Sequence, residues 1–234
     1  MELEKSNING SHILSNTPKQ DRDYRVVTYD FKRPDKFSLD QIRTISVMHE
    51  IFAQKASLTL SSMLRDKVKI EVNSVDQLTY GEFIDSIPKP STLLKVDMSP
   101  LNQAALMQID PDVTFNINDR LYGGEGNYKN RGGELSNIEK SILLKVSDRL
   151  MVNLKESWEK VETLTPKVEQ IETLPEFISI AHLMDMVFLV SFKIEIGEIS
   201  GFINFCVPYM TIEPIIAKFS AEYWYSISTT GEKG

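Results

Sequence analysis

The sequence predicts an α/β sandwich with pseudo-two-fold symmetry, in which two α-β-β-β-α repeats share one sheet and two long helices. Three observations predict it. A helix-start signal followed by a long apolar stripe occurs twice, strand patterns follow each helix in the same order, and each half closes on a short helix. A repeated order of this kind indicates two copies of one structural unit. Two apolar helix faces need a common surface to cover, and six strands supply one sheet.

Each long helix begins at a serine that can form a capping box. Gln41 stands three residues after Ser38, and Glu139 stands three residues after Ser136. Apolar residues then recur at helical spacing. In the first helix they are Ile42, Ile45, Met48, Phe52, Ala56, Leu60 and Met63; in the second they are Ile138, Ile142, Val146, Leu150, Leu154, Trp158 and Val161.

Alternating apolar residues predict three strands in each half. In the first half they are 68–72, 92–98 and 104–110, and in the second 168–171, 186–196 and 201–209. The phrases VDQLTYGEFIDSI and IETLPEFISI follow the first strand of each half and pair Phe83 with Phe177. Short helices over 111–121 and 210–219 close the two halves.

Composition divides the chain into three parts. Residues 1–35 are polar and lack apolar periodicity, so we expect a flexible leader. Residues 36–226 form the predicted domain, and residues 227–234 form a polar tail.

The charge and the apolar segments exclude several classes of protein. The net charge is −7 and the pI is about 5.1, with no basic cluster interleaved with aromatics, so no nucleic-acid partner is expected. No apolar run reaches transmembrane length. The one cysteine, Cys206, lies in an apolar run and is interpreted as a small buried hydrophobe.

The motifs of common active sites are missing from the sequence. There is no phosphate-binding GxxxxGK loop, no complete GxGxxG and no GxSxG elbow. His12, His49 and His182 stand far apart and lack metal-ligand spacing, and we place His49 at the edge of the apolar face of the first helix. No catalytic residue, cofactor or metal is therefore predicted.

A glycine-rich loop joins the two halves. Five of the eleven glycines fall within residues 122–133, which read YGGEGNYKNRGG. Glycine is retained where the backbone needs positive φ or approaches another surface closely. The loop is therefore predicted to be exposed and to make contacts, and the alternative is a flexible connection between the halves.

Four segments together carry a resemblance to a known family. They are YDFKRPDKFSLDQIRT (29–44), SVDQLTYGEFIDSIPKPS (74–91), DRLYGGEG (119–126) and FCVPYMTIEPI (205–215). They resemble the middle domain of the FliM family of bacterial flagellar motor switch proteins, over about residues 29–220. The resemblance implies the CheC-like fold, a place in the C ring at the cytoplasmic base of the flagellum, and a role in torque transmission and rotational switching in chemotaxis.

The resemblance also implies a binding site and partners. The family's GGXG motif contacts the rotor protein FliG, and neighbouring FliM copies contact each other laterally. The residues implied for FliG binding are Gly123, Gly124, Glu125 and Gly126, together with Asp119 and Arg120 at the preceding helix end.

Two features common in the family are not found in this sequence. Residues 1–28 lack the LSQxEIDxLL pattern that binds phosphorylated CheY, and the sequence ends soon after Ala217 without a FliN-like domain. We therefore expect a fragment or a shortened relative. A weak contact with CheY stays open, and FliN is expected to bind only through the C-terminal domain absent here.

The alternative function is a CheC-like phosphatase of phosphorylated CheY, since that enzyme has the fold that the resemblance implies. Its chemistry needs a Glu and, three residues later, an Asn that orients water, both on a long helix. Here Glu139 is followed by Ile142 and Glu50 by Ala53. Glu4 and Asn7 have the spacing but lie in the predicted leader. A non-enzymatic interaction module is therefore the favoured interpretation.

Overall fold

The structure is a computed structural model that describes residues 36–126 and 134–220. The predicted leader and polar tail lie outside the described residues. The elements are α1 (Leu39–Leu64), β1 (Val68–Thr79), α2 (Tyr80–Ser86), β2 (Thr92–Asp97), β3 (Ala105–Ile109), α3 (Pro111–Leu121), α4 (Asn137–Trp158), β4 (Lys167–Glu172), the 3₁₀ turn η1 (Pro175–Phe177), β5 (Met186–Ile196), β6 (Ile199–Pro208), α5 (Tyr209–Ile212) and the 3₁₀ turn η2 (Glu213–Phe219).

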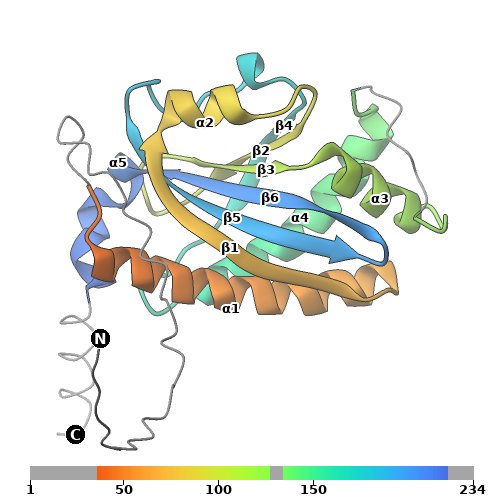
Figure 1. Cartoon of the computed structure of the whole chain (residues 1–234), viewed down its shortest axis with the longest axis horizontal. Coiled ribbons are helices and arrows are strands. Elements are labelled where there is room, and N and C mark those ends of the chain that lie inside the picture. Colours follow the sequence, from red (N-terminus) through yellow and green to blue (C-terminus); the bar gives the residue numbers. More distant parts are fainter. Residues whose placement is uncertain (1–35, 127–133, 221–234) are drawn as a thin grey trace, which may run out of the picture. The chain divides into compact units, whose positions relative to one another are not determined.

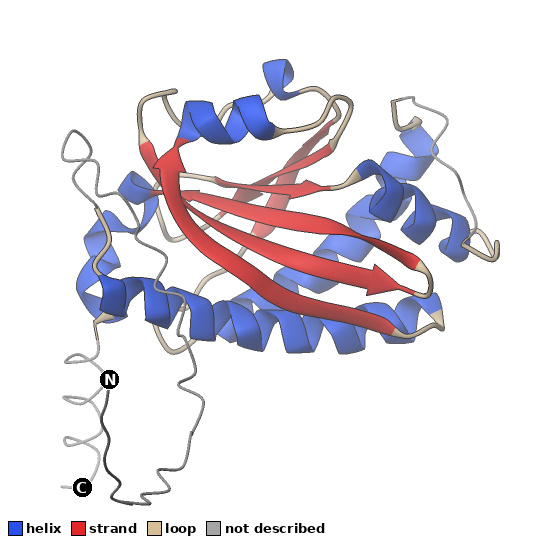
Figure 2. Cartoon of the chain, viewed as in Figure 1, coloured by secondary structure: helices blue, strands red, loops and turns tan. Residues whose placement is uncertain are grey.

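The six described strands form one antiparallel sheet in the order β1-β5-β6-β3-β2-β4 (Figure 2). Exchanging β1 with β4, β2 with β5 and β3 with β6 gives the same order read backwards. The pseudo-two-fold axis therefore passes between β3 and β6. Among the described strands, each edge strand pairs only with a strand of the other half. The predicted fold class, two repeats that share one sheet with two long helices, is confirmed.

The two faces of the sheet bury different side chains. Adjacent residues of a strand point to opposite faces. Met107 and Phe205 join the larger core beneath α1 and α4, while Leu106 and Cys206 join a smaller core beneath α2. Figure 1 shows α1 and α4 on one side of the sheet and α2 on the other.

Both predicted capping boxes are present. The N–H of Ser38 donates to Gln41 Oε1 at 2.8 Å, and the N–H of Ser136 donates to Glu139 Oε2 at 2.7 Å. The serine hydroxyls accept in return from the backbone three residues on. A third box, on Thr79, starts α2. Local sequence therefore fixes where these helices begin.

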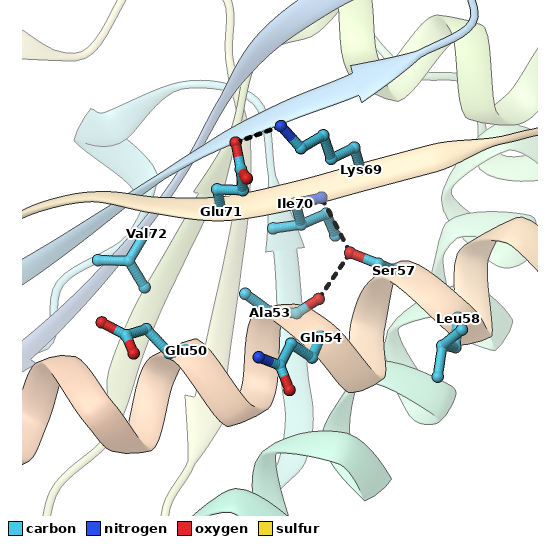
Figure 3. Close-up of a pocket in the computed structure, with 9 residues that line it drawn as sticks. All are labelled: Glu50, Ala53, Gln54, Ser57, Leu58, Lys69, Ile70, Glu71 and Val72. Atoms are coloured by element: carbon cyan, nitrogen blue, oxygen red, sulfur yellow. Dashed lines mark hydrogen bonds and ion pairs between the residues drawn. The ribbon is translucent and has the colours of Figure 1, made fainter.

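Helix α1 covers part of the outer edge of β1 (Figure 3). Ser57 Oγ accepts from the N–H of Ile70 at 2.9 Å and donates to the carbonyl of Ala53, and Ser61 Oγ accepts from the N–H of Val68 at 2.9 Å. Edge N–H groups left free would invite pairing with another chain. An open groove of about 630 Å³ lies beside this contact between α1 and β1. The residues that line it include Glu50, Gln54, Leu58, Lys69, Glu71 and Val72.

Strand β1 is longer than predicted because a bulge interrupts its alternation. The register shifts between Val72 and Ser74. A bulge inserts one extra residue, so the inward positions change parity at this point. Val75 then packs against the larger core, and the strand continues to Thr79. The phrase VDQLTYGEFIDSI, which starts at Val75, therefore begins inside the strand rather than after it.

The expected equivalence of Phe83 and Phe177 is wrong in packing terms. Phe83 is 1% exposed on α2, whereas Phe177 is 66% exposed. The second half has only the 3₁₀ turn η1 in place of the helix α2, so the aromatic ring cannot reach the sheet. Ile178 fills the smaller core from that half instead.

The closing helix of the first half is confirmed as α3, but that of the second half differs from the prediction. Residues 210–219 fall in the short helix α5 and the 3₁₀ turn η2. Pro214 has no N–H to donate to a preceding carbonyl, which explains why an α-helix does not continue.

Among the described residues, no helix is both long and apolar enough to cross a membrane.

His49 is inside the core, not at the edge of the helix face. Its exposure is 0%, and its ring lies 5.9 Å from Trp158 and 5.8 Å from Phe205, measured between ring centroids. The buried face of α1 is wider than the apolar face predicted from the sequence, because both α4 and the sheet pack against this helix.

Candidate partner-binding site

The glycine loop begins where α3 ends. The N–H of Gly123 donates to the carbonyl of Arg120 at 3.0 Å, and the N–H of Gly124 donates to that of Asp119 at 2.9 Å. With φ of +90° at Gly123, these two bonds form a Schellman motif. The first glycine is therefore required by the helix terminus, where a β-carbon would be strained.

Gly126 is held by three side chains of α3. Its N–H donates to Asp119 Oδ2 at 2.8 Å, and its carbonyl accepts from Asn116 Nδ2. Its φ is +77°, and a β-carbon there would lie 2.6 Å from Cζ of Arg120. The guanidinium thus packs directly on the bare α-carbon, and Gly126 is buried.

Gly124 and Glu125 form the exposed part of the described loop. Both residues are exposed, as are Tyr122 and Gly123. A β-carbon on Gly124 would overlap the carboxylate of Asp119, lying 2.5 Å from its Cγ. The segment from Tyr122 to Gly126 is therefore a folded motif fastened to α3. Residues 127–133, which hold the remaining predicted loop residues, lie outside the described residues.

The structure brings all six predicted site residues together but divides their roles. Gly123, Gly124 and Glu125 are exposed to solvent. Asp119 and Arg120 direct their side chains at the loop itself, so they shape the surface from beneath.

Sequence reasoning missed two further residues of this site. Asn116 bonds Gly126, and Asp66 lies 2.7 Å from Arg120 Nη1 at the far end of α1. Asn116 could have been found as the neighbour of Arg120 one helical turn earlier. No local signal points to Asp66.

Cys206 is buried in the smaller core. Burial raises the pKa of the Cys206 thiol well above its usual value, as expected for a buried hydrophobe. The described residues hold no group of three or more His, Cys, Asp or Glu side chains that could bind a metal.

The Glu-x-x-Asn spacing also occurs at Glu134 and Asn137, a pair that sequence reasoning missed. Glu134 precedes the N-cap Ser136, so the pair does not lie on one helix face.

Comparison with known proteins identifies the family. The family described as "Flagellar motor switch protein FliM" matches residues 38–224, well over half of the chain. The chain belongs to the FliM family. FliM of Treponema pallidum (strain Nichols) is 48% identical over 202 residues, and FliM of Borreliella burgdorferi is 46% identical over 208 residues. The matches cover 86% and 88% of this chain and 59% of each relative, so the chain spans about three-fifths of their length.

A solved structure of a relative includes a partner. The crystal structure of the FliG–FliM complex from H. pylori contains a chain 33% identical to this one, with a TM-score of 0.75. The match covers 77% of this chain and 99% of that chain. The resemblance to a FliM middle domain is confirmed, and these relatives favour the motor-switch interpretation over the phosphatase alternative.

Proposed function

We propose that this chain is an interaction module of the flagellar motor switch and binds FliG through the loop of Gly123, Gly124, Glu125 and Gly126. The observation that carries the proposal is a GGEG loop fixed to α3 with its first three residues exposed. A relative that matches 77% of this chain was solved with FliG. Bare backbone on a rigid support lets an apolar partner surface approach closely at little entropic cost.

The module binds further copies of itself laterally in the C ring, at the cytoplasmic face of the flagellar base, and takes part in rotational switching. The outer faces of α1 and α4 support this part of the proposal. Val47, Leu58 and Val152 are 56%, 74% and 50% exposed there, and Lys55 pairs with Glu156 between the two helices. Such scattered apolar groups suit a weak contact that depends on assembly.

The module works without catalysing a reaction. A phosphatase of this kind would need an amide to orient water on a long helix. The positions three residues after Glu50 and Glu139 carry Ala53, which is buried, and Ile142, and neither side chain can hydrogen-bond water.

Titration calorimetry of the chain with the FliG middle domain tests the proposal. Glu125→Arg reverses an exposed charge at the centre of the loop and is expected to weaken binding by about tenfold, or about 1.4 kcal/mol. Glu159→Arg, at the exposed C-cap of α4, is the matched control and should bind like the unaltered chain. Equal affinity of both variants would remove the loop from the FliG interface.

A further inference from the structure

Arg120 joins three segments of the chain that are far apart in sequence. Its Nε donates to Asn116 Oδ1 at 3.0 Å, and its Nη1 lies 2.7 Å from Asp66 Oδ2. Asp66 stands in the turn between α1 and β1. A β-carbon on Gly197, in the turn between β5 and β6, would lie 3.1 Å from Arg120 Nη2 and 3.2 Å from Asp66 Oδ2.

The ion pair is partly enclosed and geometrically specific. The side chains of Arg120 and Asp66 are 16% and 30% exposed. Salt screens such a pair less than a fully exposed one. The planar guanidinium bonds Asn116 and Asp66 with different nitrogens while its face covers Gly126, an arrangement that a lysine ammonium cannot reproduce.

The end of the loop depends on where the guanidinium sits. Asn116 is bonded both to Arg120 and to the carbonyl of Gly126. If Arg120 loses its anionic partner, it is free to leave the α-carbon of Gly126. The exposed segment of Gly123 to Glu125 would then be held less firmly at Gly126, which would lose one of its three side-chain contacts, while the Schellman motif at the start of the segment would remain.

We propose that Asp66 is a positioning residue for the partner-binding loop. By fixing Arg120 against Gly126, Asp66 holds the loop in the shape that binds the partner, although Asp66 lies far from the loop in the sequence. The affinity arm of its test rests on the proposed function, whereas the hydrogen-exchange arm needs no partner.

The first arm is amide hydrogen exchange measured by NMR on the chain alone. In Asp66→Ala the Gly126 amide should exchange about tenfold faster, because its bond to Asp119 opens more often. The matched control is Glu162→Ala, which breaks another 2.7 Å ion pair of similar exposure, with Lys218. That variant should leave Gly126 unchanged.

The second arm is a double-mutant cycle on FliG affinity. Asp66→Ala should weaken binding about fivefold, and adding it to Arg120→Ala should weaken binding no further, since Asp66 acts through Arg120. Arg120→Lys should bind like Arg120→Ala despite keeping the charge. If thermal melts show Asp66→Ala to be unfolded, Asp66→Asn is judged by the same criteria.

The outcomes separate the two proposals. Unchanged Gly126 exchange, or an Asp66 effect that adds fully to that of Arg120, overturns the positioning role. No FliG binding by the unaltered chain refutes the proposed function, and the exchange arm then still decides whether Asp66 holds the loop.

Discussion

His49 is a titratable side chain in an aromatic environment. Its Nδ1 lies 2.7 Å from the carbonyl of Ile45, and its Nε2 has no hydrogen-bond partner among the described residues. Burial lowers the pKa of His49 to about 4, because a charged imidazole there would lose its hydration, and the Ile45 bond opposes this only in part. The folded state therefore requires the neutral ring.

We expect His49 to make the fold acid-sensitive. The ring takes up a proton near pH 6.5 in the unfolded chain but only near pH 4 in the folded one. Stability is thus undiminished above pH 6.5 and falls as pH drops towards 4, by about 3 kcal/mol in all. Urea titrations between pH 7 and 4 on the chain and on His49→Met should diverge over this range. Parallel curves would contradict the linkage.

Gly124→Val tests the bare backbone of the loop. The new side chain would displace the carboxylate of Asp119, which accepts the Gly126 N–H. We expect FliG affinity to fall at least tenfold, about 1.4 kcal/mol, with the core intact. Calorimetry paired with thermal melts measures both, and Ser200→Val on β6 is an exposed control. A folded Gly124→Val variant with full affinity would show that the loop is only a connector.

At the scale of elements, the capping boxes and the Schellman motif each involve only a few neighbouring residues at one helix end. Each satisfies helix-terminal groups that have no partner within the helix. The exposed N-cap serines Ser38 and Ser136 can therefore be altered without touching the core.

Ser136→Ala should destabilise the chain by about 1 kcal/mol, because the Glu139 N–H loses its acceptor. The midpoint of thermal unfolding should fall by about 2–4 °C. Ser141→Ala is the control on the same helix. Its hydroxyl only donates back to the carbonyl of Asn137, so alanine should be neutral or slightly stabilising there. Equal effects of the two substitutions would argue against the cap.

At the scale of the whole molecule, the strands of the two halves interleave in one sheet. β1 pairs with β5 along its full length, and β4 pairs with β2. Each half thus supplies an edge strand whose described neighbour belongs to the other half. The interface between the halves is the sheet itself.

Fragments 36–126 and 134–220 should therefore be largely unfolded alone and should fold when mixed. An isolated first half leaves β1 without a neighbour and the core faces of α1 and the strands exposed. Circular dichroism and NMR dispersion on each fragment and on the mixture measure this. A cooperative unfolding transition in either fragment alone would count against a single shared core.

The sequence predicted most residues of the candidate site but not the contacts that their side chains make. The glycine density located the loop, and adjacency placed Asp119 and Arg120 beside it. That their side chains turn towards Gly126 depends on the course of the loop after α3. The role of Asp66 could not be predicted from the sequence, because its contact with Arg120 depends on how α1 and α3 pack at one end of the sheet.

The helix starts, the strand alternation, the internal repeat and the position of the loop could be predicted from the sequence, because capping, periodicity and glycine's backbone freedom act over a few residues. The interleaved strand order, the burial of His49, the exposure of Phe177 and the ion pair of Asp66 with Arg120 could not, because they depend on contacts between segments far apart in the chain. Local patterns state which face of an element is apolar, but packing among distant segments selects which partner that face meets.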